Sequence, residues 1–382
     1  MHDTLAFLKD LIAIDSVNPT LVPGAAGEQA ISERIATEMR SVGLDVDVTE
    51  VAPGRPNVVG VVEGRATGRA LMLCGHMDTV GVAGMSAPFL PVERNGRLYG
   101  RGAQDMKSGV AAMIGVAAEM AARGLSSGRL IVAVVVDEEY ASIGADALVN
   151  GWSADGALIT EPTDLGIATS HKGFAWVEVE TRGCAAHGSR PLEGRDAILD
   201  MGRVLVRLDE LDRELQERSA RPFLGTPSLH ASTVAGGREF SVYPDRCSLK
   251  VERRTVMGEP DAVALAEVEA ILDDLRCDDP SFQASARLVF ERPPYEISTA
   301  HELPRTLATT LIRAGRPAEV VGMSFWTDAA ILGRAGIPSV LYGPTGRGLH
   351  GLDEYVEIDS VLACRDALTD LAWAYCTARR RS

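Results

Sequence analysis

Residues 70–80 read ALMLCGHMDTV, and this stretch decides the fold. Its first five residues form an unbroken apolar run, which is typical of a central strand covered by helices on both faces. Similar short runs occur at 130–136, 157–159 and 338–342. Segments with helical periodicity lie at 4–14, 28–42 and 105–123. Buried strands that alternate with helices predict an α/β fold with a sheet between two helical layers.

The pattern changes between 174 and 290, where apolar and polar residues alternate as in half-exposed strands. The expected elements are a strand from 174, a helix at 196–215, strands at 228–234 and 246–253, a helix at 261–275 and a strand at 282–290. This β-α-β-β-α-β order is that of a ferredoxin-like α+β unit. We therefore expect two domains. One is discontinuous, formed by 1–173 and 291–382, and the other is inserted at 174–290.

The composition is that of a globular protein with room for two cores. Of the 382 residues, 46% are hydrophobic and 24% are charged, near the averages for folded domains. The formal charge is −15, and an acidic surface repels phosphate backbones, so nucleic acid is not an expected partner. No apolar run approaches the roughly 20 residues of a membrane span, and residues 1–16 do not resemble a signal peptide. The six cysteines include no CxxC pair, so we expect reduced thiols in a cytoplasmic protein.

Polar side chains stand just beyond the predicted strands. These residues are His76 and Asp78 after 70–74, Glu138 and Glu139 after 130–136, Glu161 after 157–159, and His350 a short loop beyond 338–342. Asp105 follows a Gly-rich loop at the start of a predicted helix. The loops beyond the carboxyl ends of the strands form the binding crevice of an open α/β sheet. We therefore expect all seven side chains at one edge of the sheet.

Two histidines and several carboxylates are the ligand set of zinc or a similar divalent ion. A carboxylate that bridges two ions about 3.5–4 Å apart would make a two-metal hydrolytic site. The adjacent Glu138 and Glu139 repel each other when buried unless a metal or a proton intervenes, so one is expected to bind metal and the other to act as a general base. Taken singly, such residues are more often an ordinary loop histidine or solvated glutamates, but together they favour a metal site.

These motifs resemble the zinc-dependent aminoacylase and carboxypeptidase family, which includes acetylornithine deacetylase, succinyl-diaminopimelate desuccinylase and glutamate carboxypeptidases. The matching pieces, spread over nearly the whole chain, are GHMDTV (75–80), YGRGAQDMKSG (99–109), DEE (137–139), TEPT (160–163), AHGSRP (186–191) and YGPTGRGLHGLDEYV (342–356). The resemblance implies a zinc-peptidase-like catalytic domain with the inserted domain as lid or dimerisation domain. It also implies two divalent ions, zinc first, with cobalt or manganese as alternatives. The ligands would be His76, Asp105, Glu139, Glu161 and His350, with Asp105 bridging.

The same resemblance assigns the remaining site residues. Asp78 would orient His76, and Glu138 would be the general base that passes a proton from water to the leaving amine. His187 would stabilise the oxyanion in a neighbouring subunit's active site, which implies a homodimer. Arg254 would grip a substrate carboxylate. Its neighbour Arg253 would point to the opposite face of the same strand.

The sequence leaves more than one function and substrate class to be considered. Hydrolysis of an N-acyl amino acid, as by acetylornithine deacetylase, is the first hypothesis, and a metallocarboxypeptidase or dipeptidase acting on short peptides is the second. A non-catalytic metal-binding relative is disfavoured because metal binding alone does not require Glu138. A serine or cysteine hydrolase would have to use Ser189 or Cys184 near His187, yet the chain has no GxSxG elbow. The family often has Gly-Gly before Thr327, whereas this chain has Phe325 and Trp326, which would either line the substrate pocket or pack in a core.

Overall fold

The computed structural model describes residues 2–378, and the chain divides into two compact units. The first unit comprises Met1–Thr169, Ile297–Val321 and Thr327–Ser382, and the second comprises Ser170–Glu296 and Gly322–Trp326. The segment 322–326, which the sequence pattern places in the discontinuous domain, thus packs with the second unit. Among the described residues, no helix is long and apolar enough to cross a membrane.

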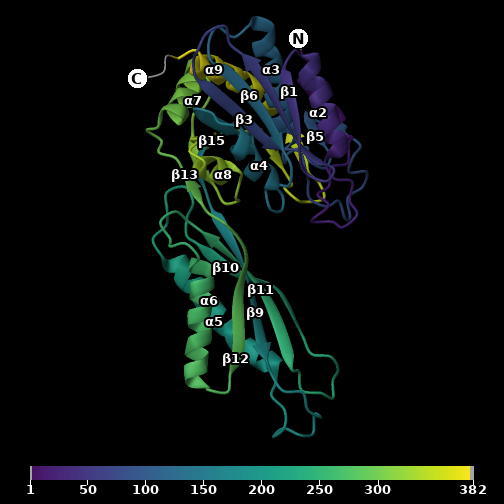
Figure 1. The fold of residues 1–382 in the computed structure, drawn as a ribbon, viewed down its shortest axis with the longest axis vertical. Coiled ribbons are helices and arrows are strands. Elements are labelled where there is room, and N and C mark those ends of the chain that lie inside the picture. The colour runs from purple at the N-terminus through teal and green to yellow at the C-terminus, as the bar shows by residue number, and fades with distance from the viewer. Residues whose placement is uncertain (1, 379–382) are drawn as a thin grey trace. The chain divides into compact units, whose positions relative to one another are not determined.

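A mixed sheet forms the centre of the first unit (Figure 1), with the strand order β1-β2-β6-β3-β7-β15-β8 and with β14 paired to β8. The bounds are Asp45–Ala52 (β1), Arg55–Glu63 (β2), Ala70–His76 (β3), Arg129–Val135 (β6), Gly156–Ile159 (β7), Ile167–His171 (β8), Val320–Met323 (β14) and Ser339–Leu341 (β15). The neighbours β6, β3, β7 and β15 run parallel. These four are the strands that the apolar runs predict, so the carboxyl ends of all four meet at one edge.

Helices cover this sheet on two sides and complete the predicted α/β fold (Figure 1). On one side, α3 and α9 pack against each other and against β3 and β6, with α1 and α2 beside α3. On the other side, α4 packs against β6 and against α8, which contacts β15. The bounds are Thr4–Ile12 (α1), Gln29–Ser41 (α2), Lys107–Arg123 (α3), Ile143–Gly151 (α4), Glu302–Arg313 (α7), Ala329–Arg334 (α8) and Ile358–Cys376 (α9).

Small residues let α3 approach its neighbours closely. A Cβ atom on Gly109 would clash with the Thr160 carbonyl, and one on Gly115 would crowd the side chain of Thr4. The helix begins at Lys107 rather than at Asp105, so Asp105 stays in the loop before it. That loop and the loop containing His350 both emerge from a small antiparallel sheet of order β16-β17-β5-β4. Its bounds are Val92–Arg94 (β4), Arg97–Tyr99 (β5), Gly346–Arg347 (β16) and Tyr355–Glu357 (β17).

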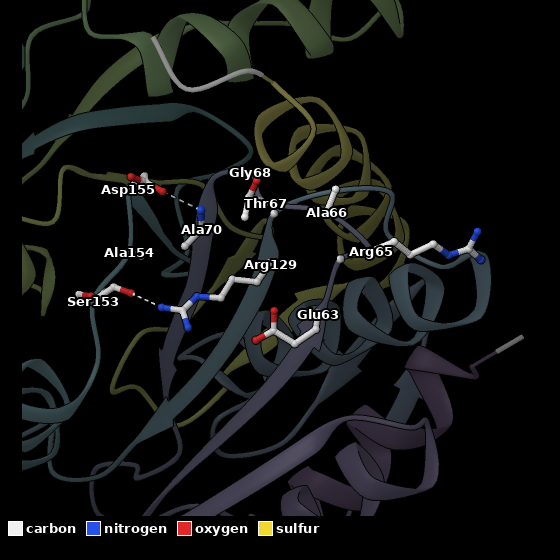
Figure 2. Close-up of a pocket in the computed structure, with 12 residues that line it drawn as sticks. Glu63, Arg65, Ala66, Thr67, Gly68, Ala70, Arg129, Ser153, Ala154 and Asp155 are labelled. Atoms are coloured by element: carbon white, nitrogen blue, oxygen red, sulfur yellow. Dashed lines mark hydrogen bonds between the residues drawn. The ribbon is translucent and has the colours of Figure 1, made fainter. Parts of the chain in front are cut away.

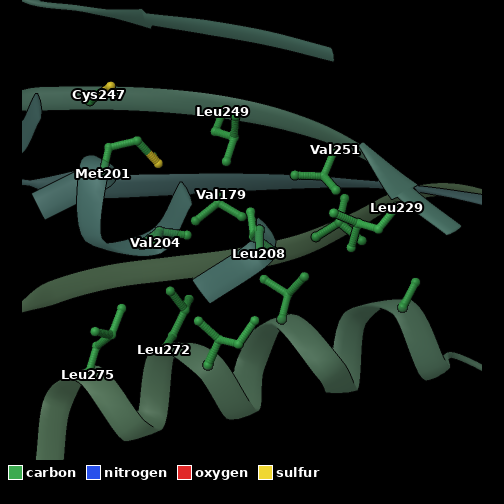
Figure 3. Packing of buried hydrophobic residues seen from close by; sticks show 14 of the residues in the cluster. Val179, Met201, Val204, Leu208, Leu229, Cys247, Leu249, Val251, Leu272 and Leu275 are labelled. Carbon is green, nitrogen blue, oxygen red and sulfur yellow. The ribbon is translucent and has the colours of Figure 1, made fainter. Parts of the chain in front are cut away.

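The second unit has the ferredoxin-like element order that its alternating pattern predicts. Its four strands pair antiparallel in the order β10-β11-β9-β12. Alternate side chains such as Val179, Leu249 and Val251 point to one face, where they pack against Val204 of α5 and Leu272 of α6 (Figure 3). The bounds are Gly173–Arg182 (β9), Ala197–Glu217 (α5), Ser228–Gly236 (β10), Arg246–Thr255 (β11), Val263–Asp278 (α6) and Gln283–Arg292 (β12).

Candidate metal centre

One edge of the central sheet collects the predicted ligands of the first unit. β3 ends at His76, and Glu138 and Glu161 follow the carboxyl ends of the adjacent strands β6 and β7. Asp105 reaches the same edge from the loop between β5 and α3. His350 lies in the loop between β16 and β17, where its backbone has a φ of 58°, in the left-handed region.

Asp105 lies between the two histidines. Its Oδ1 is 3.1 Å from His76 Nε2, and its Oδ2 is 3.4 Å from His350 Nε2. Glu161 Oε1 is 3.5 Å from His76 Nε2, and Glu139 Oε2 is 3.1 Å from His350 Nε2. The structure therefore brings the five side chains named as ligands together, with one carboxylate facing both imidazoles.

The ligand atoms form two overlapping groups that could each hold an ion. His76, Asp105 and Glu139 offer atoms within 4.8 Å of one another, and so do His76, Glu138 and Glu161. Glu138 Oε2 lies 3.8 Å from His76 Nε2, so Glu138 and Glu161 face the same imidazole. Either glutamate is thus placed to act as ligand or as base beside His76, and the motif resemblance favours Glu138 as base and Glu161 as ligand.

The carboxylates at this edge of the sheet are placed so that bound cations would neutralise them. Burial and the neighbouring carboxylates raise the pKa of Glu138, Glu139 and Glu161 above the ordinary value of a glutamate. Hydrogen bonds with Asp105 and Glu139 raise the pKa of His350 to about 10. Among the described residues, Glu139 Oε1 is buried without a hydrogen-bond partner. Crowded carboxylates with an unpaired buried oxygen are what a divalent cation neutralises, so the residues present fit a metal.

Asp78 lies against His76 with both its backbone carbonyl and its side chain. His76 Nδ1 lies 3.0 Å from the backbone carbonyl of Asp78 and 3.6 Å from its carboxylate. A carbonyl only accepts, so Nδ1 carries the proton and Nε2 keeps its lone pair for a metal. The Asp78 carboxylate also accepts the backbone N–H groups of Glu138 (3.1 Å) and Glu139 (3.2 Å). The side chain of Asp78 thus fixes the paired glutamates, and its peptide carbonyl orients the imidazole.

A buried polar network that was not predicted from the sequence contacts Asp78. Asn18 Nδ2 donates to Asp78 Oδ2 at 2.8 Å and to Asp137 Oδ1 at 3.0 Å. Arg55 binds Asp137 through Nη1 (2.8 Å) and Glu28 through Nε (2.9 Å). Asp137 stands in the DEE motif, but local spacing marks none of the other three, because Asn18 and Asp137 lie 119 positions apart.

His187 belongs to the second unit and is exposed on the loop after β9. Its Nδ1 accepts the backbone N–H of Ser189 at 3.2 Å and lies 2.8 Å from the Ser189 hydroxyl. Because Nδ1 accepts that N–H, the neutral ring carries its proton on Nε2. His187 therefore presents an N–H donor away from its own loop.

The two adjacent arginines of β11 lie on opposite faces of the second unit's sheet. Arg253 is 1% exposed and is paired with Glu259 and Glu267. Arg254 is half-buried on the other face, where its Nε donates to Glu252 Oε1 at 2.7 Å and its guanidinium stacks on Phe174. Arg253 is thus committed to the interior, and only Arg254 retains the accessibility that a substrate clamp needs.

Trp326 packs among aromatic rings of the second unit. Its ring lies 6.0 Å from those of Phe174 and His171, and its Nε1 donates to the Pro293 carbonyl at 3.0 Å. Of the two readings of Trp326, the structure favours packing in a core.

A pocket of about 550 Å³ lies at the other end of the central strands (Figure 2). It is lined by Ala70 and Arg129, the first residues of β3 and β6, and by surface loops around Arg65 and Asp155. Since His76 is the last residue of β3, this pocket is separate from the metal centre.

The chain resembles known hydrolases over nearly its full length. A model of Peptidase family M20/M25/M40 matches residues 72–374. The acetylornithine deacetylase of Myxococcus xanthus is 32% identical over 99% of this chain and 100% of that protein. The N-formyl-4-amino-5-aminomethyl-2-methylpyrimidine deformylase of Bacillus subtilis is 27% identical over 94% of this chain and 92% of that protein. The crystal structure of a tripeptidase from Staphylococcus aureus superposes with a TM-score of 0.82 at 21% identity, covering 98% of both chains. The chain therefore belongs to peptidase family M20/M25/M40 and is a metallohydrolase that acts on amide or peptide bonds.

Proposed function

We propose that this enzyme hydrolyses the amide bond of an N-acyl amino acid at a site that holds two divalent metal ions. The observation that carries the proposal is the placement of Asp105, whose Oδ1 faces the imidazole of His76 and whose Oδ2 faces that of His350. Glu161 lies beside His76 and Glu139 lies beside His350, so a further carboxylate accompanies each of the two imidazoles. A shared central carboxylate with two ligand pairs is the arrangement that a dinuclear hydrolytic centre requires.

The metal ligands in this proposal are His76, Asp105, Glu139, Glu161 and His350. Zinc suits two imidazoles and three carboxylates, and cobalt or manganese are the alternatives. When bound, the ions would polarise the scissile carbonyl and lower the pKa of water. The carbonyl of Asp78 would keep His76 in the liganding tautomer, because it holds the proton on Nδ1.

Glu138 is the proposed general base. Burial and the nearby Glu161 raise the pKa of Glu138, which brings a carboxylate closer to the neutral range in which a base is efficient. Its backbone N–H donates to the Asp78 carboxylate at 3.1 Å, so the backbone from which the side chain extends is fixed. Glu138 would take a proton from the attacking water and deliver it to the leaving amine.

The second unit would supply substrate contacts. Arg254 would bind the carboxylate of the amino-acid part through paired hydrogen bonds, and His187 would donate its Nε2–H to the developing oxyanion. We propose that His187 acts in the site of a second copy of the chain. The edge strand β10 supports a homodimer, because residues 230–236 are all exposed, as is Leu199 on the adjacent helix α5.

Short peptides are the second candidate substrate, because a tripeptidase shares the fold across the whole chain. Both candidate substrates require the same metal centre. They differ only in the group on the carbonyl side of the cleaved bond, which is a simple acyl group in one and an amino acid or peptide in the other. The proposed cytoplasmic location is supported by the six cysteines, all of which are free thiols.

Metal removal followed by a substrate panel tests this proposal. The chelated enzyme should lose activity and regain it when zinc or cobalt is added back. N-acetyl amino acids should then be cleaved faster than N-succinyl amino acids, dipeptides and tripeptides. Activity that survives complete metal removal would overturn the metal mechanism, and faster cleavage of peptides would replace the deacylase with a peptidase.

A further inference from the structure

The loop that carries Asp105 is held by a single buried side chain from a distant part of the chain. Glu354, just before β17, is 1% exposed. Its Oε1 accepts the backbone N–H groups of Gln104 (2.9 Å) and Asp105 (3.1 Å). Its Oε2 accepts the N–H of Gly102 at 3.0 Å and a guanidinium N–H of Arg101 at 2.6 Å. Both oxygens are therefore filled, and three of the four donors are backbone groups of the Asp105 loop.

The same ion pair also reaches the loop that carries His350. Arg101 Nη2 donates to the carbonyl of Gly351 at 3.1 Å, directly after His350, and to the carbonyl of Gly81 at 3.0 Å. Glu354 thus fixes the backbone at Asp105 directly and the backbone beside His350 through Arg101. These are the two residues whose side chains meet at 3.4 Å in the metal centre.

We propose that Glu354 is a positioning residue that sets the spacing of Asp105 and His350 and thereby the affinity of the centre for its second metal ion. The inference rests on the proposed two-metal function. Glu354 itself is not a ligand, because N–H donors occupy both of its oxygens. Its effect passes through the backbone, in the way that residues behind metal ligands control ligand orientation.

Glu354→Gln is the informative change. The amide keeps the shape of the side chain, but its NH2 group would face N–H donors on one side. The hydrogen bonds on that side of residue 354 must therefore break. We expect one of the two metal-binding events to weaken roughly 10- to 100-fold. We also expect kcat to fall more than KM rises, since the substrate contacts proposed for Arg254 are unchanged.

Asp155→Asn is a matched control. The Asp155 carboxylate also accepts a backbone N–H, that of Ala70 at 2.8 Å, but at the opposite end of β3 from His76 (Figure 2). This variant should match the wild type in metal affinity and in kcat, even if it unfolds at a lower temperature.

The measurement is calorimetric titration of the metal-free proteins with zinc, alongside their thermal unfolding and their kinetics. A Glu354→Gln variant with wild-type metal affinity overturns the proposal, whether or not it is less stable, because Glu354 would then be purely structural. If Glu354→Gln does not fold, Glu354→Asp, which keeps the charge on a shorter arm, must show a smaller loss of metal affinity in the same direction, and unchanged affinity overturns the proposal. A wild-type protein that binds fewer than two ions would instead overturn the proposed function.

Discussion

Replacing Arg55 by methionine tests whether the buried polar network beside Asp78 depends on this one buried cation for its stability. The side chain of Arg55 is 9% exposed, and those of its partners Glu28 and Asp137 are 0% and 2% exposed. Methionine fills most of the same volume but leaves both carboxylates without the guanidinium. Breaking a buried ion pair from one side typically costs about 3–5 kcal/mol, because the remaining charge stays buried. That cost is a large part of the roughly 5–15 kcal/mol by which folded proteins are stable.

Urea unfolding followed by circular dichroism measures this cost. Arg55→Met should lower the free energy of unfolding at pH 7 by about 3–5 kcal/mol. Adding Glu28→Gln should restore part of the loss, because it removes one of the stranded charges, so the two changes should not be additive. A single variant within about 0.5 kcal/mol of the wild type, or strict additivity in the double variant, would refute the reasoning.

The pH dependence gives an independent check. Burial raises the pKa of Glu28 even with Arg55 present, and removal of Arg55 should raise it further. A carboxyl group whose pKa is higher in the folded than in the unfolded state binds a proton more tightly when folded. Its contribution to stability is therefore fully present below the unfolded pKa and is lost as the pH rises through the folded pKa. The deficit of Arg55→Met should shrink on acidification from pH 7 towards about pH 5, and a deficit that grows would contradict the assignment to Glu28.

Three further predictions concern catalysis, packing and assembly. Glu138→Gln should keep both metal ions by calorimetric titration and lose about 10²- to 10⁴-fold in kcat; undiminished turnover would remove Glu138 from its role as base. Gly109→Ala should destabilise the protein by about 1–3 kcal/mol in urea unfolding, because its Cβ would meet the Thr160 carbonyl. The matched change Gly202→Ala lies in the interior of α5, where the added Cβ would have no described atom within 4 Å beyond its chain neighbours and its own helix backbone. It should stabilise the protein by about 0.5–1 kcal/mol, and equal effects of the two changes would contradict the packing argument. Val234→Lys on the edge strand β10 should convert a dimer to a monomer in light scattering, whereas Val289→Lys on the opposite edge strand β12 should not. A dimer that survives Val234→Lys places the interface elsewhere.

The sequence predicted the parts of the fold that depend on local pattern. The apolar run at 70–74 became the central strand β3, and the alternation between 174 and 290 became a sheet with one buried face. The placement of His76 and Glu161 at one sheet edge followed from strand ends alone. The start of α3 was less accurate, because the helix begins at Lys107 and leaves Asp105 in a loop.

What the sequence could not supply was the set of contacts that join distant segments. Glu354 lies 249 positions from the N–H of Asp105 that it binds, and nothing in the spacing of either motif relates the two. The contacts of Asp78 show the same limit on a smaller scale. Its carbonyl and its carboxylate both lie near His76, and only the backbone course shows that the carboxylate also accepts the N–H groups of Glu138 and Glu139.

The carboxylates of this centre divide into two kinds according to what fills their oxygens. Those of Asp78 and Glu354 each receive N–H donors on both oxygens, which stabilises the anion without a metal. Glu139 keeps one buried oxygen without a hydrogen-bond partner in the part of the chain that the structure describes, and both oxygens of Asp105 face imidazoles. A carboxylate already saturated by N–H groups has little left to offer a cation, whereas an unsaturated one remains costly until a cation arrives. The hydrogen-bond pattern thus separates carboxylates that fix the backbone from carboxylates that can still contact a cation, and it supports Glu139 and Asp105 as the proposed metal ligands independently of the motif resemblance.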